Sequence, residues 1–249
     1  MSMAESDEQL AERLATAAGA ILMKLRTRGD LAGKELGKAG DAEANAMLCR
    51  ELRAARPGDA LLSEEEKDNP ARCDRSRVWI VDPLDGTREY GEGRDDWAVH
   101  VALAVDGAAT VGAVALPGLG VTLTSGAPAP LRPANAPLRM LVSRTRPAAE
   151  AVFVAERLGA ELVAMGSAGA KAMAVVRGEA DIYLHTGGQY EWDNCAPVAV
   201  AQAAGLHVSR ADGSPLCYNR PDPYLPDLLI CRKELAADVL RLAVEYSHA

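Results

Sequence analysis

Residues 78–87 have the sequence VWIVDPLDGT, in which an apolar run leads directly into two aspartates. Four apolar residues in a row are typical of a buried strand, and the proline that follows has no N–H with which to continue the strand's hydrogen bonds. The strand should therefore end at Asp82 and Asp85, with the backbone oxygen of Leu84 between their side chains. Gly86-Thr87 follows where outward-facing N–H groups could bind a phosphate. An ordinary Asp-Pro or Asp-Gly turn is the alternative interpretation.

Two more acidic segments lie at the ends of predicted core elements. Glu64 belongs to the sequence SEEE at residues 63–66, which follows a short apolar run, and Asp193 precedes an apolar helix rich in Ala and Val. Taken alone, the first would be a solvated acidic surface and the second a helix N-cap. If the three segments converge, they form an all-oxygen cage that suits a hard cation such as Mg²⁺.

The histidines and cysteines give no sign of another metal site or of disulfides. The histidines are His100, His185, His207 and His248, and their lack of ligand spacing disfavours zinc. His100 and His207 each lie inside a strand pattern and are interpreted as core or surface residues. The five cysteines are scattered and contain no CxxC pair, so we expect buried thiols.

Composition and charge exclude several classes of protein. The chain has 249 residues with 49% hydrophobic content, which is enough for a substantial core. Its formal net charge of -8 argues against binding of a nucleic-acid polymer, because such proteins present basic surfaces. No apolar run approaches the roughly 20 residues of a membrane span, and residues 1–9 are acidic. We therefore expect a cytoplasmic protein.

The first half of the chain predicts two helices followed by a sheet. Apolar residues at helical spacing predict helices over residues 10–25 and 44–52. The Gly- and charge-rich stretch between them, residues 26–40, is interpreted as an exposed loop or a mobile lid. Short apolar or alternating runs then predict a largely antiparallel sheet. Its strands are expected at residues 60–62, 78–81, 97–105, 110–116 and 121–124.

The second half has the alternating pattern of an α/β structure. Strands are expected at residues 138–142, 161–164, 181–184, 206–208 and 228–231. Helices are expected at residues 147–158, 167–177, 193–204 and 233–246. We accordingly divide the chain into an N-terminal α+β half, residues 1–133, and a C-terminal α/β half, residues 134–249, with the site between them.

The acidic motifs together resemble one protein family. The order and spacing of DPLDGT at residues 82–87, the preceding Ser63-Glu64-Glu65 and the distant Trp192-Asp193 resemble the signature set of the inositol monophosphatase superfamily over nearly the whole chain. This resemblance implies an α/β (α+β) fold, the layered αβαβα sandwich of the inositol monophosphatase and fructose-1,6-bisphosphatase type.

Within that superfamily, four motifs resemble the CysQ branch, the 3′(2′),5′-bisphosphate nucleotidases. These motifs are Thr87-Arg88-Glu89-Tyr90, Ser143-Arg144, Glu191-Trp192-Asp193 and Tyr218-Asn219-Arg220. Inositol monophosphatases more often have Asn where this chain has Glu89. The chain departs from the branch at residues 166–171, where the Gly-Ser segment is displaced by one residue, and at His185, where the branch often has an Arg.

The resemblance also implies the roles of individual residues. It makes the magnesium ligands Glu64, Asp82, the Leu84 carbonyl, Asp85 and Asp193. Asp41 matches the family's Asp that pairs with Thr87 to orient the attacking water, and Glu64 helps to hold the Mg²⁺ that binds this water. Asp41 could instead be a helix N-cap. The implied substrate-side residues are Gly86, Thr87, Arg88, Ser167, Lys171, His185 and Asp193. Lys171, on a predicted helix, could also be a solvated surface residue.

The implied activity is magnesium-dependent hydrolysis of 3′-phosphoadenosine 5′-phosphate to AMP and phosphate in sulfur assimilation, with 3′-phosphoadenylyl sulfate as a second substrate. Inositol monophosphatase or fructose-1,6-bisphosphatase activity is the runner-up. A non-catalytic nucleotide- or metal-binding regulator is a different class, and the presence of every expected ligand weighs against it. The resemblance further implies two or three Mg²⁺ ions, inhibition by lithium and a homodimer.

Overall fold

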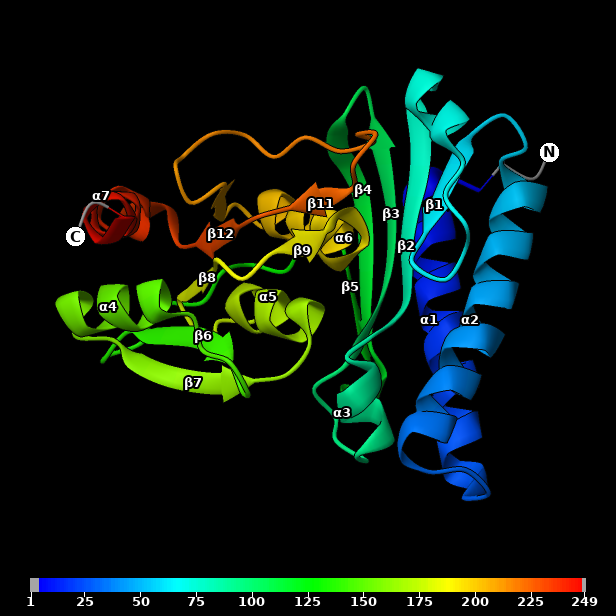
Figure 1. Ribbon diagram of the computed structural model, residues 1–249, viewed down its shortest axis with the longest axis horizontal. Helices are drawn as coiled ribbons and strands as arrows, with labels where there is room; N and C mark the ends of the chain where they lie inside the picture. Colours follow the sequence, from blue (N-terminus) through cyan, green and yellow to red (C-terminus); the bar gives the residue numbers. More distant parts are fainter. Residues whose placement is uncertain (1–4, 248–249) are drawn as a thin grey trace.

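A pair of long helices, α1 (Asp7–Arg28) and α2 (Gly33–Ala55), opens the computed structural model and covers one face of a five-stranded sheet (Figure 1). Ser6 starts α1 through a capping box with Gln9, and the buried side chains of α1 recur at helical spacing. The structure describes residues 5–247, so His248 lies outside the described residues. No helix in this range is long and apolar enough to cross a membrane.

The loop or lid predicted over residues 26–40 is wrong, because α2 already begins at Gly33. Glycines lower helix propensity, which explains the wrong prediction. The packing requires them: a Cβ on Gly37 would lie 2.6 Å from Cγ2 of Thr87, and one on Gly40 would lie 2.8 Å from Cδ2 of Leu22. Close contact with neighbouring elements therefore outweighs the local preference of this segment.

The first sheet has the strand order β1-β2-β3-β4-β5 and is antiparallel except for the parallel β1–β2 pair, as predicted. Its strands are β1 (Ala60–Ser63), β2 (Arg77–Asp85), β3 (Ala98–Val105), β4 (Ala108–Leu116) and β5 (Val121–Thr124). The β2–β3 register shifts between Asp82 and Asp85, where the proline interrupts the ladder. The short helix α3 (Thr87–Gly91) follows at once, and short 3-10 turns occupy Pro70–Asp74 and Pro117–Leu119.

The second sheet has the order β10-β12-β8-β6-β7, with β6 parallel to both β7 and β8. Its strands are β6 (Arg139–Ser143), β7 (Glu161–Met165), β8 (Ile182–His185), β10 (His207–Ser209) and β12 (Leu228–Cys231). A two-stranded ribbon of β9 (Gln189–Tyr190) and β11 (Tyr224–Leu225) was not predicted, because two-residue strands leave no periodicity to detect. The proposed division at residue 133 falls in the segment between β5 and β6 and stays a prediction.

The helices of the second half fill the space between the sheets and cover the far side. These helices are α4 (Ala149–Leu158), α5 (Ala168–Val176), α6 (Glu191–Ala203) and α7 (Ala236–Ser247), which follows a 3-10 turn at Lys233–Leu235. Helix α6 packs on β4 and β3, α5 packs on α6 and β8, and α4 packs on β6 and α7. The order of layers is thus α1/α2, first sheet, α5/α6, second sheet, α4/α7 (Figure 1), which confirms the predicted αβαβα arrangement.

Candidate active site

Three carboxylates from two distant segments meet at the centre of the molecule. Asp82 and Asp85 end β2, and Asp193 lies in the first turn of α6. One oxygen from each of the three lies within 4.8 Å of the others. Two of the three acidic segments that were predicted to converge, those of Asp82-Asp85 and Asp193, therefore meet, and a set of carboxylate oxygens suits a hard divalent cation.

Asp85 is the most firmly held of the three carboxylates. It accepts hydrogen bonds from Ser167 Oγ at 2.5 Å, Gly169 N at 2.6 Å and Ala168 N at 3.2 Å, so it binds the N-terminus of α5. Burial opposes its ionisation, but His100 and these donors outweigh burial and lower the pKa of Asp85 to about 2. Asp85 therefore stays negatively charged at neutral pH.

Burial and mutual repulsion oppose ionisation of the neighbouring carboxyl groups, and the nearby His100 and Lys171 offset only part of this effect on Asp193. Burial and the charges of Glu64 and Asp85 raise the pKa of Asp82 well above its usual range. Burial and the Asp85 charge raise the pKa of Asp193 to about 6, and partial burial with the charges of Asp193 and Asp85 raises that of Glu64 to about 7. Such crowding is the electrostatic condition under which a divalent cation binds and displaces protons.

A second pair of predicted residues meets beside this cluster. Asp41 lies inside α2, so the alternative of a helix N-cap is wrong. Its Oδ2 lies 3.4 Å from the hydroxyl of Thr87, which is also 3.1 Å from the carbonyl oxygen of Leu84. Asp41 is 7% exposed, and its other oxygen has no hydrogen-bond partner among residues 5–247. Burial and the charges of Glu65 and Glu64 raise its pKa to about 7.

The Gly166-Ser167 loop is fixed from two sides. Lys171 is buried, so the alternative of a solvated surface lysine is wrong. Its Nζ donates to the carbonyl oxygens of Gly166 at 3.0 Å and Ser167 at 2.6 Å. On the other side, Asp96 Oδ2 accepts from Gly166 N at 2.7 Å. Ser167 adopts a φ of 45°, in the left-handed region, and these contacts hold it there against Asp85.

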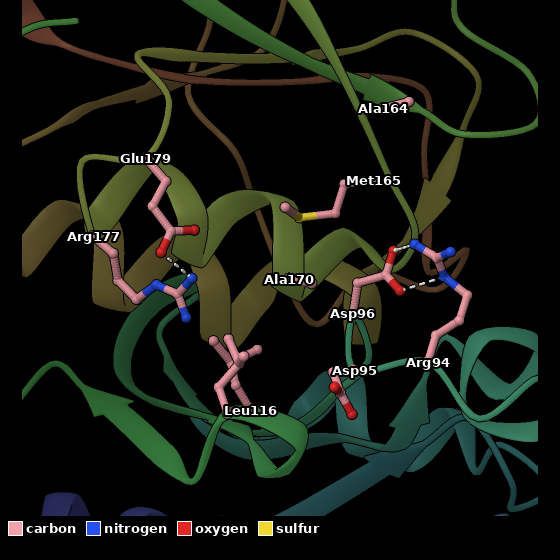
Figure 2. A pocket seen from close by; sticks show the side chains of 10 residues that line it. Arg94, Asp95, Asp96, Leu116, Ala164, Met165, Ala170, Arg177 and Glu179 are labelled. Carbon is pink, nitrogen blue, oxygen red and sulfur yellow. Dashed lines mark hydrogen bonds and ion pairs between the residues drawn. The ribbon is translucent and has the colours of Figure 1, made fainter.

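A cavity of about 560 Å³ lies beyond this loop, and Figure 2 shows its lining side chains. Arg94 and Asp96 form a bidentate pair at 2.6 and 2.9 Å on one side of the cavity, and Arg177 pairs with Glu179 on the opposite side (Figure 2). Asp95 is paired with Arg26 at 3.2 Å. Because its charges are already paired, this cavity does not provide the anion-binding or cation-binding chemistry of the acidic cluster. The cavity is connected to the active site through Asp96, which accepts the hydrogen bond from Gly166 N.

The remaining predicted residues lie in different places in the fold. Gly86 has a φ of 88° and lies against Trp97, which explains the glycine there. Arg88 is exposed, pairs with Glu92 at 2.8 Å and lines a cavity of about 500 Å³ that also includes Thr87 and the cationic side chains of Lys34 and Lys38. His185 lies apart, in a cavity of about 450 Å³ near Tyr246, where it contacts the Gly188 carbonyl at 3.0 Å.

His100 is a site residue that the sequence analysis assigned to the core or surface. It is fully buried, with Nδ1 2.9 Å from the carbonyl oxygen of Trp192 and Nε2 3.3 Å from Asp85 Oδ2. It thereby connects the end of β2 to the start of α6. The signal was available: a single His inside an otherwise apolar strand that is buried on both faces needs polar partners.

Fold and site together fit one class of protein, a metal-dependent phosphatase with its acidic cluster where β2 ends and α6 begins. The chain belongs to the inositol monophosphatase family, whose model matches residues 3–248. The predicted resemblance to this family is confirmed.

Curated relatives also confirm the predicted branch. The chain is 52% identical to the 3′-phosphoadenosine 5′-phosphate phosphatase of Mycobacterium tuberculosis over 238 residues, which cover 90% of this chain and 88% of the relative. It is 50% identical to the protein of that name from Mycobacterium leprae, over 94% of this chain and 92% of the relative. The 3′(2′),5′-bisphosphate nucleotidase CysQ of Escherichia coli K12 is 30% identical, over 75% of this chain and 81% of the relative.

Solved structures agree with the layered fold. CysQ from Bacteroides thetaiotaomicron superposes with a TM-score of 0.79 at 24% identity, covering 92% of this chain and 98% of that one. Inositol monophosphatase II from Staphylococcus aureus also gives 0.79, at 19% identity, with 96% of each chain covered. At these identities the structural likeness establishes the fold.

Proposed function

We propose that this protein is a 3′-phosphoadenosine 5′-phosphate phosphatase, which releases the 3′-phosphate to give AMP, with 3′-phosphoadenylyl sulfate as a second substrate. The observation that carries the proposal is the 50 to 52% identity to relatives of this name over at least 90% of the chain. The acidic cluster and the Asp41–Thr87 pair support it, because they provide the groups that hydrolysis of a phosphate ester needs.

In the proposed site, Glu64, Asp82, the Leu84 carbonyl oxygen, Asp85 and Asp193 would hold Mg²⁺. Bound Mg²⁺ would supply Lewis-acid stabilisation of the phosphoryl oxygens and a water of lowered pKa. Thr87 donates its hydroxyl hydrogen toward Asp41 and so turns its lone pairs toward the attacking water. Asp41, with a pKa of about 7, accepts the proton that leaves the water, through Thr87.

We also propose that the protein binds two or three Mg²⁺ ions, is located in the cytoplasm and forms a homodimer. The ion bound by Asp82, Asp85 and Asp193 should be the weaker one, since water and substrate phosphate must complete its shell. Lithium, with a size close to that of Mg²⁺ and half its charge, should occupy this position and inhibit at concentrations where sodium and potassium do not.

The test is phosphate release from 3′-phosphoadenosine 5′-phosphate, inositol 1-phosphate and fructose 1,6-bisphosphate at one Mg²⁺ concentration. We expect the highest kcat/KM for the nucleotide. Equal or reversed constants would move the assignment to the runner-up activities, and no turnover of any substrate would favour a regulator. Asp85→Asn should abolish turnover in a folded protein, while Asp238→Asn on the exposed face of α7 is the matched control.

A further inference from the structure

Three aromatic side chains form a cluster beside the acidic site, which we call the aromatic platform: Tyr190, Trp192 and Tyr224. The rings of Tyr190 and Trp192 are stacked, with centroids 4.8 Å apart and an interplanar angle of 9°. Tyr224 meets Tyr190 edge to face at 5.9 Å and 77°. The backbone N–H of Tyr190 donates to Asp193 Oδ2 at 2.6 Å, so the platform is connected directly to the carboxylate cluster.

The platform combines exposed rings with a fixed backbone. Tyr190 and Tyr224 are 45% and 47% exposed, although aromatic side chains of this size usually bury most of their area. Their backbones are opposite each other in the β9–β11 ribbon, and Glu191 N bonds the carbonyl oxygen of Pro223 at 2.8 Å. Glu191 also accepts from Asn219 N and Arg220 N, at 2.7 and 2.8 Å. The rings are therefore held toward solvent by a rigid support.

We propose that the aromatic platform binds the base of the substrate by stacking, with Tyr190 as the main contact; this inference rests on the proposed function. A nucleoside 3′-phosphate carries its base one ribose away from the phosphate that the acidic cluster would bind. The backbone N–H of Tyr190 contacts Asp193 and its side chain is 45% exposed, so an accessible aromatic ring lies next to the carboxylate cluster. Aromatic rings bind the π-face of any base, and the interaction tolerates changes in base identity.

The platform would also explain how one family scaffold selects nucleotides. Inositol and fructose phosphates have no flat π-face, so they gain nothing from the stacked rings. A base contributes binding energy at a position remote from the reacting phosphorus, and this energy should appear mainly in KM. The platform is thus a specificity determinant that acts separately from the catalytic pair of Asp41 and Thr87.

The first experiment compares Tyr190→Ala and Tyr190→Phe in hydrolysis of 3′-phosphoadenosine 5′-phosphate. Loss of a base stack should raise KM about tenfold, which corresponds to about 1.4 kcal/mol, with kcat changed less than about twofold. Tyr190→Phe keeps the ring and should restore KM. Tyr246→Ala is the matched control, because Tyr246 is an exposed tyrosine on α7 that packs on Phe153.

The second experiment measures competitive inhibition by AMP and by ribose 5-phosphate, which lacks the base. Tyr190→Ala should weaken inhibition by AMP and leave inhibition by ribose 5-phosphate and the half-saturating Mg²⁺ concentration unchanged. Equal weakening of both inhibitors, or a raised Mg²⁺ requirement, would mean that Tyr190 only supports Asp193 and would overturn the inference. Unchanged KM in Tyr190→Ala would do the same. If the wild-type protein releases no phosphate from the nucleotide, the proposed function and this inference both fail.

Discussion

The hydroxyl of Thr87 lies between Asp41 and the Leu84 carbonyl oxygen, at 3.4 and 3.1 Å. If it orients the attacking water, Thr87→Ala should lower kcat by about 10²-fold or more and change KM little, because the carboxylate ligands stay in place. Thr110→Ala is the control, since Thr110 lies on the exposed end of β4 and its hydroxyl donates to the backbone oxygen of Ala108. A Thr87→Ala enzyme with raised KM and normal kcat would make Thr87 a binding residue.

The raised pKa of Asp41 leads to a prediction about the pH dependence of turnover. The pKa of this carboxyl is raised to about 7 in the metal-free protein, and bound Mg²⁺ would lower it. Because the protonated carboxyl cannot accept a proton, kcat/KM should fall as pH decreases, with a midpoint below 7 in the presence of Mg²⁺. The Glu65 charge is the largest charge contribution to this shift. Glu65→Gln should therefore lower the pKa of Asp41 and move the acid limb of the pH–rate profile to lower pH. If the acid limb of the pH–rate profile did not move, it would report the ionisation of a group other than Asp41.

The contacts of His100 on both sides of the cluster lead to a prediction about the Mg²⁺ concentration that the enzyme requires. Its two ring nitrogens contact Trp192 O and Asp85 Oδ2, so it positions residues on both sides of the cluster. Burial opposes protonation, but Asp85 outweighs it and raises the pKa of His100. His100→Ala should raise the half-saturating Mg²⁺ concentration several-fold, with partial recovery in His100→Gln, which keeps a donor. His207→Ala, on a strand far along the second sheet, is the control, and equal effects of both would contradict the positioning role.

At the level of elements, the packing of α2 against α3 places Asp41 beside Thr87. Gly37 permits this contact, because a Cβ there would lie 2.6 Å from Thr87 Cγ2. In a solvent-exposed helix, Gly→Ala would stabilise by about 0.5–1 kcal/mol, but overpacking costs about 1–3 kcal/mol. Gly37→Ala should therefore lower both the melting temperature and kcat.

The control for this substitution is Gly58→Ala, since a Cβ on Gly58 meets no atom within 4 Å. It should leave kcat unchanged and alter stability by less than about 0.5 kcal/mol. Circular dichroism melts and steady-state rates give the two readouts. A Gly37→Ala protein more stable than wild type with normal kcat would show that α2 can shift freely, contrary to the close contact described above.

In the whole molecule, the cluster joins two parts of the chain that are far apart in sequence. Asp82 and Asp85 come from the first sheet and Asp193 from the helix layer between the sheets, so a bound cation would connect the two. Mg²⁺ at a hundredfold excess over its Kd should add about 2.7 kcal/mol to the free energy of unfolding. For a chain of this size the melting temperature would rise by roughly 5–10 °C.

The measurement is thermal unfolding with MgCl2 against KCl at equal ionic strength. Asp193→Asn should reduce the Mg²⁺-dependent shift in melting temperature, whatever it does to the metal-free protein. A shift of equal size in wild type and Asp193→Asn would place the stabilising cation elsewhere. Asp238→Asn, which changes an exposed carboxylate on α7, should keep the full shift.

The sequence predicted the elements and the ligand segments because both depend on local chemistry. Apolar periodicity gives the strands and helices wherever one face or both faces are buried, as in β2 and α6. The motif at residues 82–87 and Asp193 were found as acidic residues at the ends of core elements. The same reasoning failed over residues 26–40, where helix-disfavouring glycines are kept for contacts with other elements.

Only the tertiary structure determined which side chains meet. The burial of Lys171, the links of His100 to Asp85 and Trp192, and the edge-to-face contact of Tyr224 with Tyr190 depend on how distant elements pack. Local sequence contains propensity and periodicity, but a hydrogen bond between residues far apart in the chain follows from the layered packing of both sheets. The sequence by itself therefore determined the family, most of the elements and the acidic ligand candidates, whereas the folded chain determined their geometry and the residues that support them.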